Sequence, residues 1–341
     1  MQNKQNKQFL MKRTITFLFL SALLVACAPK EQYFEDSGTV FHTLYHIKYQ
    51  APALLTGQID AELQAFNLSL NPFNANSVIA KINRNEDVEA DDYFTTVFNR
   101  AMYISELSSG MFDITCAPMI NLWGFGTANT DSVTPQMIDS IKQFVGYRKV
   151  RLEGKRLIKD DPRIQLNCSA IAKGYACDVV ASLLERNGVK NYMVEIGGEI
   201  VANGVNNQGN PWRIGIRKPE DLALNAPAQT EKIISLNEKR GMATSGDYLN
   251  YYLKDGKKYA HTINPKTGYP AEQNILSATV LAADCMTADG FATAFNALGL
   301  EEACRLADTL PELDYFFIGI DEMGQYVVKF SKGMEKYTGE K

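Results

Sequence analysis

Between residues 288 and 294 the chain reads Ala288-Asp289-Gly290-Phe291-Ala292-Thr293-Ala294, inside a predicted helix over 287–298. Because Asp289 and Thr293 are four residues apart, their side chains share one helix face. A carboxylate and a hydroxyl are hard oxygen ligands that suit Mg²⁺, which commonly completes its coordination with substrate phosphate oxygens. The pair therefore predicts a metal site for a phosphate-bearing ligand. A capping Asp289 beside an ordinary helical Thr293 is the alternative that the spacing alone leaves open.

The elements predicted around this helix are a mixture of helices and short strands. Apolar residues at helical spacing predict helices over 55–68, 92–108 and 172–187. Alternating apolar residues and turn signals predict strands over 39–49, 314–319 and 325–330, near Val150, Ile158 and Ile164, and at several places within 192–282. Because strands and helices follow no regular alternation, we expect one α+β domain over residues 39–335, with mixed β-sheets flanked by helices.

Composition and charge narrow the class of protein. The 341 residues are 45% hydrophobic and 22% charged, which is typical of a globular protein with a sizeable core. The formal net charge is −4, and removal of Lys4, Lys7, Lys12 and Arg13 with the first 26 residues leaves 31 basic against 39 acidic residues, or −8. An acidic body argues against nucleic acid as the main partner. The chain has only three histidines and no Cys-x-x-Cys pair, which argues against a zinc-binding site.

The N-terminus has the features of a bacterial lipoprotein signal. The basic pair Lys12-Arg13 precedes an apolar run that is too short to span a bilayer. That run ends in Leu24-Val25-Ala26-Cys27, which looks like a lipobox whose Cys27 carries diacylglycerol and palmitate-type acyl chains. We expect a signal peptide over 1–26, a lipidated tether over 27–38, and an exported, membrane-anchored lipoprotein facing the periplasm of a bacterium. An ordinary signal peptide with a chance cysteine is the alternative.

Two glycine-bearing segments predict close contact with a ligand. In Asn167-Cys168-Ser169-Ala170-Ile171-Ala172-Lys173-Gly174, small residues lead into a helix with Lys173 in its predicted first turn. Free backbone N–H groups and one cation at a helix start favour an anion. The glycine pair of Ile196-Gly197-Gly198-Glu199 ends a predicted strand and allows a ligand or another backbone to approach closely. A plain strand-to-helix turn and a tight turn are the alternatives.

Further segments carry polar or aromatic side chains suited to a site. Ala243-Thr244-Ser245-Gly246 holds two hydroxyls but lacks the Gly-x-Ser-x-Gly of a serine hydrolase. His261 ends a predicted strand before a turn, a position that suits a general base, with a structural histidine as the alternative. The rings of Asn71-Pro72-Phe73 and Gly110-Met111-Phe112-Asp113 predict stacking on a flat heterocycle, with core packing as the alternative.

Taken in order, these segments resemble one known family. The motifs are SxxPFxxxSxIxxIN (69–83), GxFDIT (110–115) with LWGFG (122–126), AIAKGYA (170–176), IGGE (196–199), ATSGDY (243–248), HTINPKTG (261–268) and ADGFATA (288–294). They resemble the ApbE family of FAD:protein FMN transferases over residues 39–330, and many of its members are lipoproteins. The resemblance implies a single ApbE-like, T-fold-related domain.

The resemblance also implies a role for each matching residue. Family members use Mg²⁺ to hold the FAD pyrophosphate, which implies Asp289, Thr293 and the Ala170 carbonyl as metal ligands. His261 matches the histidine implicated in catalysis. The FAD contacts implied by matching positions are Phe73, Phe112, Asp113, Asn167, Lys173, Gly197, Gly198, Thr244, Ser245 and His261.

The implied reaction is attack by an acceptor Thr or Ser hydroxyl on the FMN-side phosphorus of FAD, with AMP leaving. Such transfers are catalysed mainly by position and charge neutralisation, here from the metal and Lys173, with His261 as base. The implied acceptors are flavoprotein subunits of Na⁺-pumping NADH:quinone oxidoreductases or of Rnf-type complexes. Two alternatives stay open: an FAD pyrophosphatase that releases FMN and AMP, and a flavin-binding lipoprotein without chemistry.

The chain departs from the family pattern at three places. Val40-Phe41-His42-Thr43 stands where many members carry Met-Gly-Thr, so a different local turn is expected. Asn264 replaces the commoner aspartate of His-x-Ile-Asp-Pro, which puts a charge role at that position in doubt. Asn167 occupies a position that is acidic in some members, and this change removes no metal ligand.

Overall fold

The computed structural model describes residues 31–126, 133–219, 230–246, 251–254, 257–260, 262–271 and 274–339. An eight-stranded sheet forms the centre, and each pairing between its neighbouring strands is antiparallel. The strand order is β1 (Gln32–Val40), β2 (Thr43–Ala51), β5 (Tyr192–Ile196), β6 (Glu199–Asn203), β9 (Arg240–Ser245), β12 (Ile275–Ala282), β13 (Asp314–Ile320) and β14 (Tyr326–Phe330). The predicted α+β class is confirmed, with more regular strand pairing than the sequence indicated.

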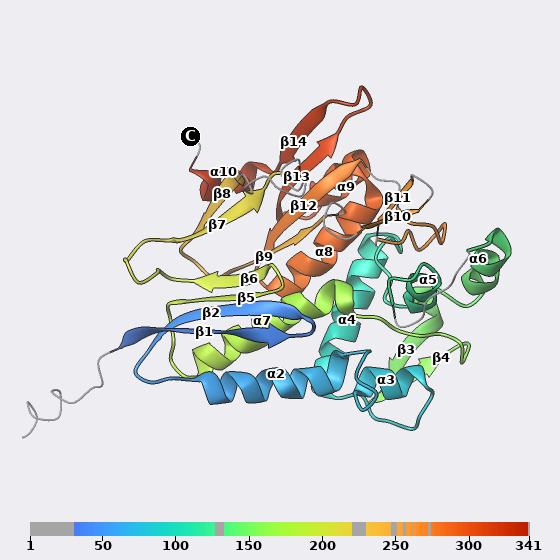
Figure 1. The fold of residues 1–341 in the computed structure, drawn as a ribbon, viewed down its shortest axis with the longest axis horizontal. Coiled ribbons are helices and arrows are strands. Elements are labelled where there is room, and N and C mark those ends of the chain that lie inside the picture. The colour runs from blue at the N-terminus through green and yellow to red at the C-terminus, as the bar shows by residue number, and fades with distance from the viewer. Residues whose placement is uncertain are drawn as a thin grey trace, which may run out of the picture.

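Helices cover one face of this sheet (Figure 1). Helix α7 (Ser169–Arg186) packs against β5 and β6, and α8 (Cys285–Leu298) packs against β9 and β12. Helices α2 (Thr56–Leu70) and α4 (Asp92–Leu107) lie against α7, and α4 also contacts α8. The main core lies between these layers, and its largest fully buried aromatic side chains are Tyr49, Tyr192, Phe66, Phe94, Phe291, Phe295 and Phe317.

Helices α7 and α8 approach each other closely, and one glycine makes this possible. A Cβ atom at Gly174 would lie 2.3 Å from the Cys285 carbonyl oxygen and 2.7 Å from the Asp289 Cβ. Asp178 of α7 then accepts hydrogen bonds from the backbone N–H groups of Cys285 and Met286, both at 2.8 Å. These bonds satisfy donors that the first turn of α8 leaves free. The junction fixes which residues of α8 face α7.

The opposite face of the sheet is covered by a hairpin and the C-terminal helix. The hairpin consists of β7 (Trp212–Arg217) and β8 (Thr230–Leu236), and α10 (Glu335–Thr338) contacts β8. Figure 1 shows these elements on the side away from α7 and α8. A separate apolar cluster fills this side, and its members include Ile200, Trp212, Ile214, Ile234, Leu236, Met242, Ile318 and Tyr337.

The other described elements are short. They are α3 (Val78–Asn83), α5 (Ala117–Leu122), α6 (Pro135–Lys142), α9 (Leu300–Ala307), the 3₁₀ turns η1 (Tyr147–Lys149) and η3 (Lys332–Met334), and the hairpins β3–β4 (Val150–Glu153, Arg156–Lys159) and β10–β11 (Tyr251–Lys254, Lys257–Ala260). Within the described ranges, no helix has both the length and the apolar character needed to cross a bilayer.

The first hairpin corrects two predictions. The strand expected over 39–49 is two strands, β1 and β2, joined by a turn at Phe41 and His42. The predicted tether is wrong from Gln32 onward, because β1 begins there. Its polar Asp36 is buried and accepts hydrogen bonds from the Tyr49 hydroxyl at 2.9 Å and the Thr56 hydroxyl at 2.6 Å. The polar side chains of β1 resemble those of a tether because an edge strand exposes one of its faces to water.

Several predictions fall outside the described residues. They concern the signal peptide, the lipidated Cys27 with the first residues of the tether, the catalytic histidine His261, and the end of the ATSGDY motif at Asp247 and Tyr248. The strand expected near Ile164 is not formed; Gln165 instead makes an isolated bridge to Cys116.

Candidate functional site

The Asp289 carboxylate lies in the junction between α7 and α8. Asp289 is 5% exposed, and its Oδ2 accepts a hydrogen bond from the backbone N–H of Gly174 at 2.9 Å. Burial raises the pKa of Asp289, whereas the nearby Lys173 ammonium and the Gly174 N–H act in the opposite direction. A buried carboxylate beside a cation is more typical of a functional site than of surface capping. The capping alternative for Asp289 is therefore disfavoured.

An ion pair between the half-buried Lys173 and the buried Glu199 adjoins this carboxylate. The Lys173 ammonium donates to Glu199 Oε1, and Glu199, the first residue of β6, is 3% exposed. Burial raises the pKa of Glu199 to about 7, against the opposite influence of Lys173. Burial disfavours the charge on Lys173 as well, but Glu199 and Asp289 more than offset this and raise its pKa. One cation thus serves two buried carboxylates.

Glu199 also has an oxygen that the protein leaves unpaired. Its Oε2 is buried and has no hydrogen-bond partner among the described residues. Leaving a buried polar atom unpaired costs on the order of 1–3 kcal/mol, so such atoms usually mark a missing partner. The sequence placed Glu199 in the IGGE motif without a role, because its lysine partner belongs to another segment of the chain.

The other two predicted metal ligands also meet. The Thr293 hydroxyl donates to the Ala170 carbonyl oxygen at 3.4 Å, so α8 and the first turn of α7 bring these oxygens together one helical turn from Asp289. Among the described residues, no group of three or more His, Cys, Asp or Glu side chains is arranged to hold a metal ion by itself. A carboxylate, a hydroxyl and a carbonyl form a sparse, hard-oxygen set, which fits Mg²⁺ that shares its coordination with phosphate oxygens.

The start of α7 corrects the predicted place of Lys173. The helix begins at Ser169, three residues earlier than expected, so Lys173 lies beyond the first turn. The Asn167 side chain accepts from the Ser169 N–H at 2.8 Å, and the Asn167 N–H donates to the Ile114 carbonyl at 2.8 Å. Asn167 therefore forms an Asx-type turn just before the helix, whose N-cap is Cys168, and joins that turn to the GxFDIT loop. An amide oxygen accepts this bond as an aspartate oxygen would.

The glycine pair of the IGGE motif lies beside Lys173. A Cβ atom at Gly197 would lie 3.0 Å from Thr43 Cγ2 and 3.1 Å from Lys173 Cδ, and Gly197 has a φ of 68°. Its φ and its close contacts both favour glycine at this turn between β5 and β6. Gly198 is exposed, and a Cβ built on it would meet no atom within 4 Å. Gly197 thus lies against Lys173, and Gly198 leaves open space in the same turn.

Thr244 and Ser245 point to opposite faces of the sheet. In β9, Ser245 pairs with Ala278, and its hydroxyl accepts from the Asn296 amide at 3.2 Å on the helix side. Thr244 instead pairs with Thr279, and their hydroxyls lie 2.9 Å apart on the other side. Successive strand residues alternate in this way. The structure brings the Ser245 side chain toward α8 and places the Thr244 side chain on the other face, and contact of either residue with FAD stays a prediction.

Phe112 and Asp113 act within their own loop. Phe112 is 2% exposed and belongs to the main core. Asp113 Oδ1 accepts from the N–H and the hydroxyl of Thr115 at 2.8 and 2.6 Å, and Oδ2 accepts from the Tyr147 N–H at 2.8 Å. Burial raises the pKa of Asp113, partly offset by these bonds. Both residues shape the loop against which Asn167 packs, and their predicted contact with FAD stays a prediction.

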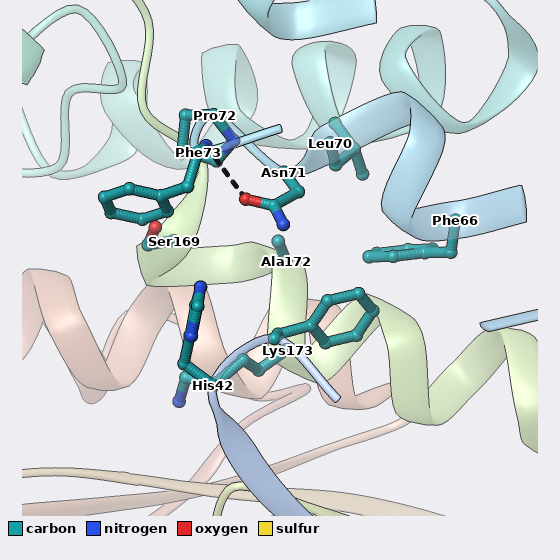
Figure 2. A pocket seen from close by; sticks show the side chains of 10 residues that line it. His42, Phe66, Leu70, Asn71, Pro72, Phe73, Ser169, Ala172 and Lys173 are labelled. Atoms are coloured by element: carbon teal, nitrogen blue, oxygen red, sulfur yellow. Dashed lines mark hydrogen bonds between the residues drawn. The ribbon is translucent and has the colours of Figure 1, made fainter. Parts of the chain in front are cut away.

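Phe73 lines a pocket together with Lys173. The pocket has a volume of about 140 Å³, and Figure 2 shows Phe73 and His42 on one side of it and Phe66 on the other. Because Lys173 lines the pocket and also reaches Glu199, the pocket opens next to the polar junction. Phe73 is 52% exposed, so the stacking prediction, rather than core packing, fits its position.

The loop that follows His261 is held in place by the LWGFG motif. The Trp123 indole N–H donates to the Gly268 carbonyl at 2.8 Å. Asn264 Oδ1 accepts from the N–H groups of Lys266 and Thr267 at 2.9 and 3.1 Å. Asn264 therefore makes the turn that an aspartate would make, and its lack of charge does not alter that function.

The comparisons with known proteins agree on one family. A model of the ApbE family matches residues 41–317. The FAD:protein FMN transferase of Haemophilus influenzae is 35% identical, with 96% of this chain and 99% of the relative covered. The FAD:protein FMN transferase of Vibrio cholerae is 36% identical, with 87% and 91% covered.

Solved structures give the same result. The flavin transferase ApbE from Vibrio cholerae superposes with a TM-score of 0.81 at 34% identity, over 90% of this chain and 99% of that chain. The apo form of the Pseudomonas stutzeri flavinyl transferase ApbE gives a TM-score of 0.80 at 30% identity, over 92% of this chain and 98% of that chain.

Proposed function

The chain belongs to the ApbE family, and on that premise we propose that it is an Mg²⁺-dependent FAD:protein FMN transferase. It attaches FMN through a phosphoester bond to a Thr or Ser hydroxyl of an acceptor protein and releases AMP. The observation that carries this proposal is the polar junction between α7 and α8, where the buried carboxylates of Asp289 and Glu199 lie around the half-buried Lys173 ammonium. A junction that served packing alone would be expected to bury apolar residues instead.

Asp289, the Thr293 hydroxyl and the Ala170 carbonyl would hold the metal. When bound, Mg²⁺ supplies neutralisation of phosphate charge and holds the pyrophosphate in place. Lys173 adds a second positive charge beside the same phosphates, and Glu199 keeps its ammonium from turning away. The exposed Gly198 leaves room for the nucleotide to pass. Together these residues position the pyrophosphate and spread its charge, which is the main source of catalysis in such transfers.

His261 is the proposed base, on the strength of the sequence motif. The acceptor hydroxyl oxygen forms a bond to the FMN-side phosphorus, and the bond from that phosphorus to the bridging oxygen breaks. The hydroxyl proton passes to the His261 imidazole, and AMP leaves with the bridging oxygen. General base catalysis of this kind contributes roughly 10²–10⁴-fold.

The acceptors and the location are also proposals. The acceptors are flavoprotein subunits of Na⁺-pumping NADH:quinone oxidoreductases or of Rnf-type complexes. The enzyme is exported and held at the membrane by lipid on Cys27, so that it faces the periplasm. Labelling of the protein by radioactive palmitate, and its loss in Cys27→Ser, tests the anchor.

One incubation tests the activity. Purified protein, FAD, Mg²⁺ and an acceptor domain are expected to yield an acceptor that is heavier by one FMN, as measured by mass spectrometry. Rapid AMP release without acceptor, and no mass gain with several acceptors, would instead identify an FAD pyrophosphatase. FAD binding without AMP release under any metal condition would identify a flavin-binding lipoprotein.

A further inference from the structure

The turn between β1 and β2 holds two bulky residues in a backbone conformation that normally favours glycine. Val40 pairs with Thr43, so the loop consists of Phe41 and His42 alone, with φ values of 52° and 60°. Two-residue hairpins of this kind usually contain Asn-Gly or Gly-Gly. The shared threonine aligns His42 with the glycine of the Met-Gly-Thr pattern that it departs from. Strain of this sort persists where the surroundings hold it, and it is concentrated at functional sites.

The two side chains of this turn are placed differently. The Phe41 ring lies 5.3 Å from the Phe66 ring, at the edge of the main core, and this packing accounts for Phe41. His42 is exposed, and the ring contact that the structure shows for it is with Phe73. The two ring centroids are 5.9 Å apart, with an angle of 85° between the ring planes. Packing of the core therefore gives no reason for an imidazole at position 42.

His42 and Phe73 meet at the pocket of about 140 Å³ (Figure 2). The Phe73 loop is ordered by its own bonds, since the Phe73 N–H donates to Asn71 Oδ1 at 2.9 Å and the Ser77 hydroxyl donates to the Asn71 carbonyl at 2.7 Å. An edge-to-face contact with His42 then holds the Phe73 ring in one orientation. The result is a preformed aromatic corner on one side of the pocket.

The residues that line the pocket suit the flavin half of FAD better than its adenine half. Most of the lining is apolar and includes Phe66, Leu70 and Pro72, while Asn71, Ser169 and Lys173 are its polar members besides His42. The Asn71 amide already bonds to Asn67 and to the Phe73 N–H. A cavity of roughly 150 Å³ holds a benzene-sized ring. The benzenoid edge of an isoalloxazine carries only methyl groups, whereas each edge of adenine carries polar atoms that would lose their hydrogen bonds on burial. The pocket thus favours the flavin half.

We propose that His42 is a specificity-determining residue that, together with Phe73, clamps the benzenoid edge of the isoalloxazine ring in this pocket. The proposal rests on the proposed use of FAD and adds a contact that a glycine at this position would lack. The flavin stacks in the corner between the two rings, and its phosphate extends toward Lys173. His42 therefore contributes to affinity for the flavin half and not for the AMP half.

Binding of FMN and of AMP, each without metal, tests the proposal. FMN fluorescence quenching is measured with wild-type protein and with His42→Gly, His42→Asn and His42→Phe, and AMP binding is measured by calorimetry. Loss of one aromatic contact is expected to weaken FMN about tenfold in the Gly and Asn variants. His42→Phe keeps a ring and should stay within about threefold of the wild type. AMP affinity is expected to be the same in all four proteins.

Glycine and asparagine both tolerate a φ of 60°, so these variants are expected to fold, and thermal unfolding checks this. His46→Gln is the matched control, because His46 lies in the same hairpin and bonds to Ser37 away from the pocket. Unchanged FMN affinity in His42→Gly, or a loss of AMP affinity instead, overturns the proposal. The transferase proposal fails separately if FMN binding depends on His42 but no acceptor gains mass.

Discussion

The two faces of the central sheet are held by different kinds of contact. On the face covered by α7 and α8, Asp289 and Glu199 are buried around the Lys173 ammonium, and one oxygen of Glu199 has no partner among the described residues. On the face covered by β7, β8 and α10, side chains such as Ile234 and Leu236 form an apolar cluster. Both faces belong to the same sheet.

This difference separates stability from function. Burying apolar side chains stabilises a fold by about 25 cal/mol per Å² of area removed from water. Burying carboxylates and an ammonium costs free energy unless each is paired, and an apolar replacement is often neutral or stabilising. The hairpin face is therefore expected to hold the fold together, while the α7–α8 junction keeps charges that a nucleotide and a metal would satisfy.

The largest expected effect is on activity, from Asp289→Asn. Removal of this carboxylate is expected to lower the rate of FAD cleavage by ~10³-fold, because the proposed metal would lose its charged protein ligand. The thermal midpoint should not fall, because burial already raises the pKa of Asp289 and the neutral amide avoids that cost. The matched change on the hairpin face, Ile234→Val, should lower stability by about 1 kcal/mol without changing the rate. The reverse pattern would contradict the comparison.

Replacing a glycine by alanine on each face of the sheet tests how closely that face is packed against the elements that cover it. Gly174→Ala places a Cβ 2.3 Å from a carbonyl oxygen and should cost about 3 kcal/mol as α7 and α8 separate. Gly215→Ala on β7 meets its nearest atom, Thr230 Cγ2, at 3.3 Å and should cost less than about 1 kcal/mol. Urea unfolding measures both. Equal costs would mean that the junction relaxes as readily as the hairpin.

Glu199→Gln is expected to have a smaller effect. The substitution removes the charged partner of Lys173. Because the Lys173 side chain is 32% exposed, water solvates the unpaired ammonium in part, and the free energy of unfolding should fall by about 2 kcal/mol. If Glu199 positions the lysine, KM for FAD rises about tenfold while kcat changes less. If KM for FAD is unchanged while stability falls by about 2 kcal/mol, Glu199 has only a structural role.

The smallest expected effect is a pH dependence from Asp178. Burial raises its pKa to about 7, so between about pH 4 and 7 the folded protein binds this proton more tightly than the unfolded chain. The contribution of Asp178 to stability is present at low pH and is lost as pH rises through this window. Between pH 6 and pH 7, Asp178→Asn should remove about 1 kcal/mol of that decline, as measured by urea unfolding at both pH values. Parallel pH profiles would show that Asp178 does not titrate there.

Local signals in the sequence predicted the helices well and the strands less well. Helices α2 and α4 lie within two residues of their predicted bounds, because their apolar faces repeat at helical spacing. Helix α8 begins two residues earlier than predicted, at a cap by Asp284, whose side chain accepts from the Thr287 N–H at 2.8 Å. The edge strand β1 was missed because its exposed face is polar.

The site was predicted only in part, for a physical reason. Asp289 and Thr293 are close in sequence, and their shared face could be derived from helix geometry alone. The bond from Gly174 to Asp289 joins residues 115 positions apart, and the pair of Lys173 and Glu199 depends on the turn at Gly197. Such contacts follow from topology and not from local pattern. The alternation that turns Thr244 away from the site also required the observed strand register.

The most direct test of the account is thermal unfolding with FAD and Mg²⁺, alone and together. If the α7–α8 junction is the metal–nucleotide site, FAD and Mg²⁺ together, at about 100 times the dissociation constant, should raise the wild-type midpoint by about 5 °C or more. Ile234→Val should gain as much, and Asp289→Asn should gain only what FAD alone provides. An Asp289→Asn protein that is stabilised as strongly as the wild type would contradict the account.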